Sequence, residues 1–344
     1  MQNEMQNEQK ENPMQDAPSM DSSARESLSP GVWGVVATPF QGSTLDVDLD
    51  SLSGLVEHYE AIGATGLTVL GVFGEAAALT AEERRQVLEI AVECTDLPLV
   101  VGITALATRP AIDEITAAQA VAGERLAAVM VQANSPRPEV VIAHLDAIHR
   151  ATGAKVVLQD YPLASGVSIS TTALVSVVTW CSFVVAVKAE APPTSVAIAD
   201  LTAAVGVSVF GGLGGQGLLD ELMAGAAGAM TGFSYPEALI ACVRAWQRDG
   251  YEAARDQLLP YLPLINFEQQ AKIALAVRKE CLRKRGLITD SGVRAPAAAF
   301  PEKLRYSMLT HLREAAAALE SPAGPAQANA APHIATSHTS VGSF

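Results

Sequence analysis

Short apolar runs alternate with amphipathic runs along the middle of the chain. The apolar runs consist largely of Val, Leu and Ala, which is typical of parallel strands covered on both faces. We predict strands at 34–40, 66–71, 98–104, 126–132, 154–162, 183–190, 207–212 and 229–233. We predict a helix after each strand, at 51–62, 81–94, 110–121, 139–151, 171–180, 194–205, 218–226 and 237–249.

This repetition predicts an α/β protein of the (β/α)8 or TIM barrel class, because eight strand–helix units fit into about 220 residues. An open, doubly wound sheet is the alternative. Further helices are predicted after the last unit, as a C-terminal helical extension, at 252–264, 268–285 and 301–319. The polar composition of both ends predicts a disordered leader and a disordered tail. The predicted organisation is therefore leader 1–29, barrel 30–250, helices packed on the barrel 251–320 and tail 321–344.

Charge and composition exclude several kinds of partner. A net charge of −14 disfavours nucleic acid and anionic membrane surfaces, which need clustered Lys and Arg. No apolar run reaches the roughly 18 to 20 residues of a membrane span, and the start lacks the apolar core of a signal peptide. The cysteines are far apart, which favours buried thiols in a reducing cytoplasm. The histidines show no ligand spacing, so we predict no metal.

One lysine stands out because it closes an apolar run. Lys188 follows five apolar residues of the predicted strand 183–190, whereas Lys155 opens such a run. In a (β/α)8 barrel the chemistry lies at the carboxyl ends of the strands, which is where Lys188 is predicted to be. A partly desolvated amine there can attack a carbonyl carbon in its neutral form. Lys188 is therefore a candidate nucleophile, and a strand-end lysine that reaches out to solvent is the alternative.

The ends of the other predicted strands carry a series of motifs. In chain order these are T-P-F at 38–40, G-V-F-G-E at 71–75, L-T-A-E-E at 79–83, Q-D-Y-P at 159–162, V-V-A-V-K at 184–188, F-G-G at 210–212 and G-A-A-G-A-M-T at 225–231. This order and spacing resembles the dihydrodipicolinate synthase and N-acetylneuraminate lyase family over about residues 31 to 285. The resemblance implies a (β/α)8 barrel with C-terminal helices and a homo-oligomer, usually a tetramer. It also implies a Schiff base between Lys188 and the keto carbon of a 2-oxo acid.

The resemblance places a substrate site at the strand ends. The residues expected to bind the substrate are Thr38, Val72, Phe73, Gly74, Gly212 and Met230. The backbone N–H groups of Phe73 and Gly74 are expected to hold a carboxylate, and glycines near Gly212 to let the backbone approach the 2-oxo acid. The glycine-rich stretch 211–217 lacks the Gly-Lys-Ser/Thr ending of a phosphate loop, so we predict no cofactor.

Several positions depart from the family pattern. The family turn usually has two threonines where this chain has Val72 and Phe73, and a tyrosine where it has Gln159. A second family tyrosine aligns with Ala133, and an arginine that binds a distal carboxylate aligns with Ala164. These losses disfavour dihydrodipicolinate synthase activity and ordinary pyruvate-dependent aldolases. The Gly-x-x-Gly-Glu-Ala and Gln-Asp-x-Pro turns resemble the 2-keto-3-deoxy sugar-acid branch more closely.

Three residues are candidates to replace the missing proton-transfer groups. Gln159 and Tyr161 share one face of their strand, and we expect the Tyr161 hydroxyl to lie near the imine. Glu190, two residues beyond Lys188, is expected to face the same cavity as a general acid or base. The alternatives are packing of Tyr161 over the barrel rim and a solvated loop carboxylate at Glu190. We expect Glu75 only to brace its turn by hydrogen bonds.

These observations predict a cytoplasmic lyase that acts on a small-molecule 2-oxo acid, without nucleic-acid or membrane partners. The preferred reaction is dehydration or retro-aldol cleavage of a 2-keto-3-deoxy sugar acid. A dihydrodipicolinate synthase-like condensation that uses pyruvate is one alternative. A non-catalytic, ligand-binding barrel with a vestigial lysine is another. The predicted catalytic residues are Lys188, Tyr161, Gln159 and Glu190.

Overall fold

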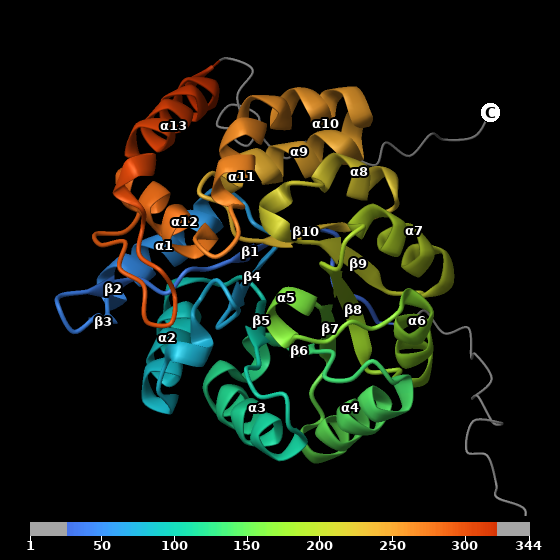
Figure 1. Ribbon diagram of the computed structural model, residues 1–344. Coiled ribbons are helices and arrows are strands. Elements are labelled where there is room, and N and C mark those ends of the chain that lie inside the picture. The colour runs from blue at the N-terminus through green and yellow to red at the C-terminus, as the bar shows by residue number, and fades with distance from the viewer. Residues whose placement is uncertain (1–25, 322–344) are drawn as a thin grey trace, which may run out of the picture.

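A closed barrel of parallel strands forms the centre of the computed structural model, which describes residues 26–321 (Figure 1). The strands are β1 Gly31–Val35, β4 Gly66–Val69, β5 Leu99–Gly102, β6 Leu126–Gln132, β7 Val156–Asp160, β8 Val184–Ala189, β9 Ser208–Gly211 and β10 Gly228–Thr231. Each strand pairs with the next in this order, and β10 closes the ring on β1. The predicted (β/α)8 barrel is confirmed, and the open sheet is excluded.

Both predicted terminal segments fall mainly outside the described residues. Of the predicted leader, only 26–29 is described, and Leu28 there is buried and donates its N–H to the carbonyl oxygen of Val185 (3.1 Å). Of the predicted tail, only Ser321 is described.

Helices follow the strands and form an outer ring. These are α1 Leu49–Ala61, α2 Ala81–Cys94, α3 Thr108–Ala122, α4 Pro138–Thr152, α6 Thr171–Trp180, α7 Thr194–Ala204, α8 Leu218–Met223 and α9 Pro236–Asp249. A short helix, α5 Pro162–Ser165, lies between β7 and α6. Helix α2 begins where predicted because Thr80 and Glu83 form a reciprocal capping box. The Thr80 side chain accepts from the Glu83 N–H, and the Glu83 side chain accepts from the Thr80 N–H, so two N–H groups at the start of the helix are paired.

The first strand is shorter than predicted. The prediction ran from 34 to 40, whereas β1 ends at Val35 and the chain then leaves the barrel. Pro39 has no N–H to donate to a sheet ladder, so it is a poor residue for a central strand. Beyond it, β2 Phe40–Gln41 pairs antiparallel with β3 Asp46–Val47 in a small hairpin outside the barrel.

The C-terminal helices differ most from the prediction. They are α10 Tyr251–Leu258, α11 Leu262–Glu268, α12 Ala274–Lys284 and α13 Arg305–Glu320, and Figure 1 shows them gathered on one side of the ring. The predicted helix 268–285 starts too early, because α12 begins only at Ala274, and the predicted helix 252–264 is divided between α10 and α11. The chain breaks between α11 and α12, and Lys272 has a positive φ of 70° there. This break aims α12 at the carboxyl ends of the strands.

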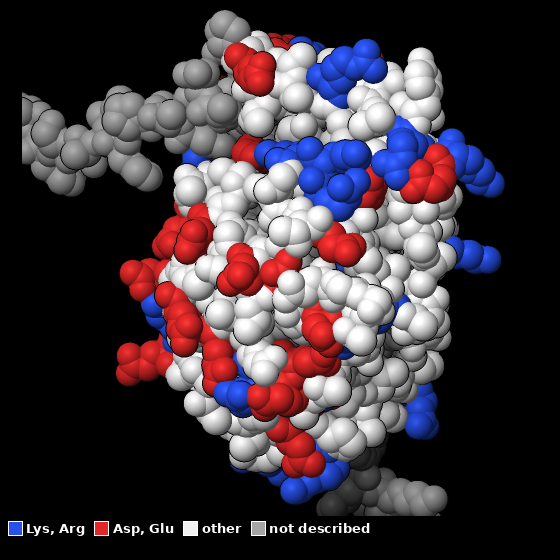
Figure 2. All heavy atoms as spheres, turned by 90° about the vertical axis from the view of Figure 1, so that its left-hand side faces the viewer, with Lys and Arg blue, Asp and Glu red and all other residues white. Residues whose placement is uncertain are grey.

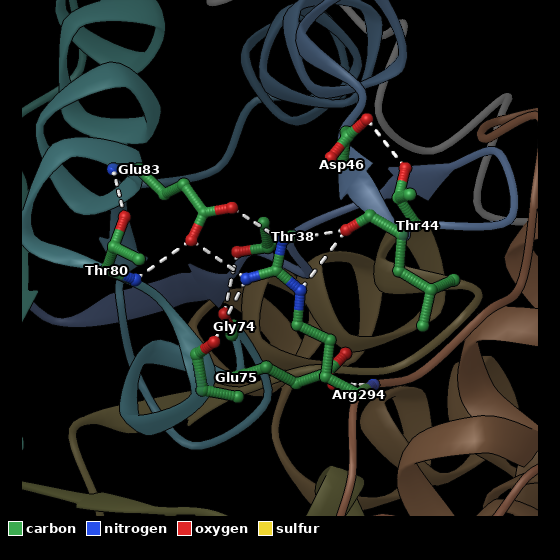
Figure 3. Close-up of polar contacts among 10 residues, drawn as sticks. Thr38, Thr44, Asp46, Gly74, Glu75, Thr80, Glu83 and Arg294 are labelled. Atoms are coloured by element: carbon green, nitrogen blue, oxygen red, sulfur yellow. Dashed lines mark hydrogen bonds and ion pairs between the residues drawn. The ribbon is translucent and has the colours of Figure 1, made fainter.

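Two cationic side chains fasten the C-terminal region to the barrel. The amine of Lys279 on α12 lies 2.8 Å from Glu75 Oε1, and both side chains are buried. Arg294 forms a two-pronged contact with Glu83 and donates to the carbonyl oxygens of Leu45 and Ala78 (Figure 3). The Arg294 N–H also donates to Glu75 Oε2 (2.9 Å). The C-terminal segment therefore holds the turn after β4 in place.

The charges that remain on the surface are unevenly distributed. In the described part of the face drawn in Figure 2, acidic side chains spread over much of the middle and lower part, and Lys and Arg gather nearer the top. This agrees with the net charge of −14. Within residues 26–321, the helices are all too short or too polar to cross a membrane.

Candidate active site

A cavity of about 240 Å³ opens at the carboxyl ends of the strands and brings together the four predicted catalytic residues. Its wall includes Lys188, Glu190, Gln159, Tyr161, Phe73, Thr231, Lys272 and Arg278. Strand register explains the first part of this arrangement. Gln159 on β7 is in register with Lys188 on β8, so the two side chains lie on the same side of the sheet, and both line the cavity inside the barrel.

Lys188 and Glu190 form a buried pair in the cavity wall. The amine lies 3.2 Å from Glu190 Oε2, and the side chains are only 7% and 6% exposed. Gln159 donates an amide hydrogen to the same oxygen (2.7 Å), and the Leu213 N–H lies 3.4 Å from the other. Three groups therefore hold the Glu190 carboxylate beside the amine. Glu190 is buried, so the expected alternative of a solvated loop carboxylate is wrong.

Tyr161 lies in the wall of the same cavity, just beyond β7. Burial raises the pKa of its hydroxyl, the negative charge of Glu190 raises it further, and Arg278 opposes this shift. The side chain is therefore a phenol rather than a phenolate at neutral pH. A neutral phenol beside a carboxylate can donate a proton or a hydrogen bond to a reacting oxygen.

The turn after β4 supplies the opposite wall. Val72 is half-exposed and Phe73 is buried, and both line the cavity. The Phe73 ring packs against Gly232, where a Cβ would come within 2.3 Å of the ring. Glu75 braces the turn through Lys279, as predicted from the sequence. In the described part of the chain, the backbone N–H groups of Phe73 and Gly74 have no backbone acceptor.

Four predicted substrate-binding residues lie outside the cavity wall, namely Thr38, Gly74, Gly212 and Met230. Thr38 is buried, and its hydroxyl donates to the Gly74 carbonyl oxygen (2.7 Å), so it supports the turn from outside the cavity wall (Figure 3). Met230 is buried in the barrel, and its neighbour Thr231 lines the cavity instead. Gly212 makes room for Glu190, because a Cβ there would come within 2.2 Å of Glu190 Oε1.

A second cavity, of about 500 Å³, adjoins the first. The two share Val72, Met130, Gln159 and Leu275 in their walls. Small apolar side chains dominate the second cavity, including Ala164 at the position of the family arginine. Gln132 also lines it, and its buried Oε1 atom has no hydrogen-bond partner among residues 26–321. The second cavity therefore offers room for a substrate chain and an unused acceptor for a hydroxyl group.

Two more carboxyl groups are buried behind Glu190. Burial and the charge of Glu190 raise the pKa of Asp160 to about 6. Burial also raises the pKa of Glu221 to about 7, with Glu190 adding to the shift and the Thr194 hydroxyl opposing it. Thr194 donates to Glu221 Oε1 (2.8 Å), while Oε2 has no hydrogen-bond partner in the part of the chain that the structure describes. Both acids therefore favour the protonated form more strongly in the folded protein than in the unfolded chain.

We expect Glu221→Gln to flatten the pH dependence of stability. Between pH 4.5 and 7 the folded protein binds more protons at Glu221 than the unfolded chain does, so its free energy of unfolding falls as the pH rises. A pKa shift of this size corresponds to up to about 3 kcal/mol. Urea unfolding of the parent protein and of Glu221→Gln at pH 5 and pH 8 measures the loss of stability with rising pH. Asp160 contributes equally to the pH dependence of the two proteins, so it cancels in the comparison. Parallel pH profiles would contradict the prediction.

No sequence motif predicted that the C-terminal region contributes to the cavity wall. Gln269, Lys272, Ala274, Leu275 and Arg278 all lie at or after the break between α11 and α12. No motif marks this break, because the sequence across it has ordinary helical composition. The positive φ at Lys272 is visible only in the structure.

Comparison with known proteins agrees with this geometry. Residues 28–315 match the model of the dihydrodipicolinate synthetase family. L-2-keto-3-deoxyarabonate dehydratase of Azospirillum brasilense is 28% identical over 82% of this chain and 93% of its own. A 4-hydroxy-tetrahydrodipicolinate synthase of Phenylobacterium zucineum is 33% identical, over 42% of this chain and 49% of its own.

A solved structure shows the same likeness. Dihydrodipicolinate synthase from Rhodopseudomonas palustris superimposes with a TM-score of 0.77 at 28% identity, covering 84% of this chain and 99% of that one. The family resemblance noted in the sequence is thus confirmed over nearly the whole described region. Because the family match extends from residue 28 to residue 315, this chain belongs to the dihydrodipicolinate synthetase family.

Proposed function

We propose that this protein is a lyase that binds a 2-oxo acid as a Schiff base on Lys188. The preferred reaction is dehydration or retro-aldol cleavage of a 2-keto-3-deoxy sugar acid. The observation that carries the proposal is the buried amine of Lys188, which lines a cavity at a strand end with Glu190 Oε2 at 3.2 Å. The likeness to L-2-keto-3-deoxyarabonate dehydratase, which extends over most of both chains, supports the choice of substrate class.

The chemistry begins when Glu190 accepts a proton from the Lys188 ammonium group. The neutral amine attacks C2 of the substrate, and the carbinolamine loses water to give a protonated imine. The imine draws electrons from C3, so a base can remove a C3 proton and leave an enamine. The enamine then expels the C4 hydroxyl, which leaves as water after protonation by an acid. Hydrolysis of the resulting imine releases the product and restores Lys188.

Three side chains are suited to the proton transfers. Glu190 lies next to the amine and serves as the base, and Gln159 holds its carboxylate in position. Tyr161, which is protonated at neutral pH, serves as the acid toward the departing hydroxyl. Gln132 Oε1 in the adjoining cavity, which has no partner within the described residues, can accept a hydrogen bond from a substrate hydroxyl. The homo-oligomeric state and the cytoplasmic location stay predictions from the sequence.

Borohydride trapping tests the proposal. The protein is incubated with pyruvate, 2-keto-3-deoxyarabonate and a series of longer 2-oxo acids, reduced, and weighed by intact mass spectrometry. We expect one covalent adduct per chain with at least one of these acids, and none with Lys188→Ala. Turnover of the trapped acid, followed by product analysis, separates dehydration from retro-aldol cleavage. An adduct that persists in Lys188→Ala contradicts the proposal. If the parent forms no adduct with any acid, the non-catalytic barrel is the better interpretation.

A further inference from the structure

Arg278 is a buried cation in the wall of the Lys188 cavity. It comes from α12, and only 8% of its surface is exposed. Its guanidinium carbon lies 5.0 Å from the centre of the Phe73 ring, on the turn that forms the opposite wall. A guanidinium group stacked on an aromatic ring keeps its N–H donors free at the edge of the plane. Arg278 therefore presents its donors close to the turn 71–75.

The protein leaves most of these donors unused. The nearest carboxylate is Glu268, whose Oε2 lies 3.4 Å from Arg278 Nε, and this nitrogen makes no hydrogen bond in the described residues. Arginine has five N–H donors, and within residues 26–321 the two Nη atoms of Arg278 also donate to no acceptor. Gly214 leaves room for the Gln269 amide, because a Cβ there would lie 1.8 Å from Gln269 Nε2, and the same Cβ would lie 3.4 Å from Arg278 Nη2.

Arg278 and Glu268 do not form an ordinary structural ion pair. Glu268 is fully buried, and its carboxylate already accepts hydrogen bonds from the hydroxyl and the N–H of Ser234. Burial raises the pKa of Glu268 to about 7, although Arg278 and Ser234 oppose the shift. Near neutral pH part of the population therefore has a protonated Glu268 facing a charged Arg278. A buried cation in that situation favours an added anion.

We infer that Arg278 binds the C1 carboxylate of the 2-oxo acid, together with the backbone N–H group of Phe73. This inference rests on the proposed function, and it names the group that orients the substrate toward Lys188. Positions 72 and 73 have no hydroxyl groups to hold a carboxylate. Phe73 instead carries the guanidinium on its ring, and the planar fork of arginine matches the two oxygens of a carboxylate. The C-terminal region thus completes a site that the barrel strands leave unfinished.

The first test compares pyruvate with methyl pyruvate, which lacks the negative charge, in the borohydride assay. We expect Arg278→Met to raise the half-saturating concentration of pyruvate roughly 10- to 100-fold and to change that of methyl pyruvate less than about twofold. Arg278→Lys keeps the charge but not the fork, so an intermediate value is expected. Arg283→Met is the matched control, because it removes a partly exposed arginine from the same helix.

A second measurement separates this inference from the proposed function. Pyruvate binding to Lys188→Ala, followed by ligand-observed NMR, requires no imine. We expect the additional change Arg278→Met to weaken pyruvate binding by roughly the same 10- to 100-fold as in the borohydride assay. Arg278→Met leaves the Glu268 carboxyl group buried without its cationic partner. Each measurement is therefore repeated with Arg278→Met/Glu268→Gln, in which neither side chain carries a charge. Unchanged pyruvate binding, or equal losses for pyruvate and methyl pyruvate, overturns the inference. A loss confined to longer acids also overturns it, because Arg278 would then hold another part of the substrate.

Discussion

Glu190→Gln is expected to lower kcat by about 10²- to 10⁴-fold, the usual contribution of a positioned general acid or base. The carboxylate lies 3.2 Å from the Lys188 amine and is held by Gln159 and the Leu213 N–H. A glutamine fills the same space and can still bond to Gln159, but it cannot accept the proton. Steady-state turnover of the acid that forms the adduct measures the loss, and circular dichroism confirms that the variant is folded.

Tyr161→Phe provides the comparison within the same cavity. Because its hydroxyl is assigned to the departing water, this variant should still form the imine while turning over more slowly. Glu190→Gln should slow imine formation as well, which rapid-quench trapping with borohydride can resolve. Unchanged kcat in either variant removes that residue from the mechanism. Equal rates of imine formation in all three proteins contradict the assignment of the first proton transfer to Glu190.

Lys279→Met is expected to reduce the free energy of unfolding by about 3 to 5 kcal/mol, because it leaves one partner of a buried ion pair alone. The Lys279 side chain is fully buried, with its amine 2.8 Å from Glu75 Oε1 and 4.1 Å from the centre of the Phe40 ring. Burial lowers the pKa of this amine and the charge of Glu75 opposes the shift. Urea unfolding at pH 7 measures the effect.

Two further variants check the cause of that loss. The double change Lys279→Met/Glu75→Gln should recover a large part of the stability, because no charge is then left buried without a partner. Lys284→Met, at the end of the same helix, should change it by less than about 0.5 kcal/mol, as for a surface site. If the double variant is as unstable as the single one, packing around Lys279 rather than its charge stabilises the helix–barrel contact.

Local periodicity predicted the barrel and part of the site. The alternation of buried strands and amphipathic helices was sufficient for the fold class, since parallel strands covered on both faces read as continuous apolar runs. Helices α2 and α6 begin at the predicted residues because their N-caps are encoded locally, by Thr80 and by Ser170. Strand-end position predicted Lys188, and the twofold alternation of strand side chains predicted that Gln159 and Tyr161 would lie beside it.

The family resemblance placed Thr38 and Met230 less well. It indicated which strand ends form the site but not which side of each backbone faces the cavity. The structure turns Thr38 toward the Gly74 carbonyl oxygen and places Thr231 rather than Met230 in the wall.

Arg278 depended on the tertiary structure alone. It lies about 90 residues beyond Lys188 in the sequence, in a helix whose start was predicted too early. Only the break at Lys272 and the buried contact of Lys279 with Glu75 bring α12 over the strand ends. A helix pattern shows which residues share a face, but what that face meets depends on contacts between distant segments. The sequence therefore determined the barrel and the position of Lys188 at a strand end, and the packing of α12 decided which cation lines the same cavity.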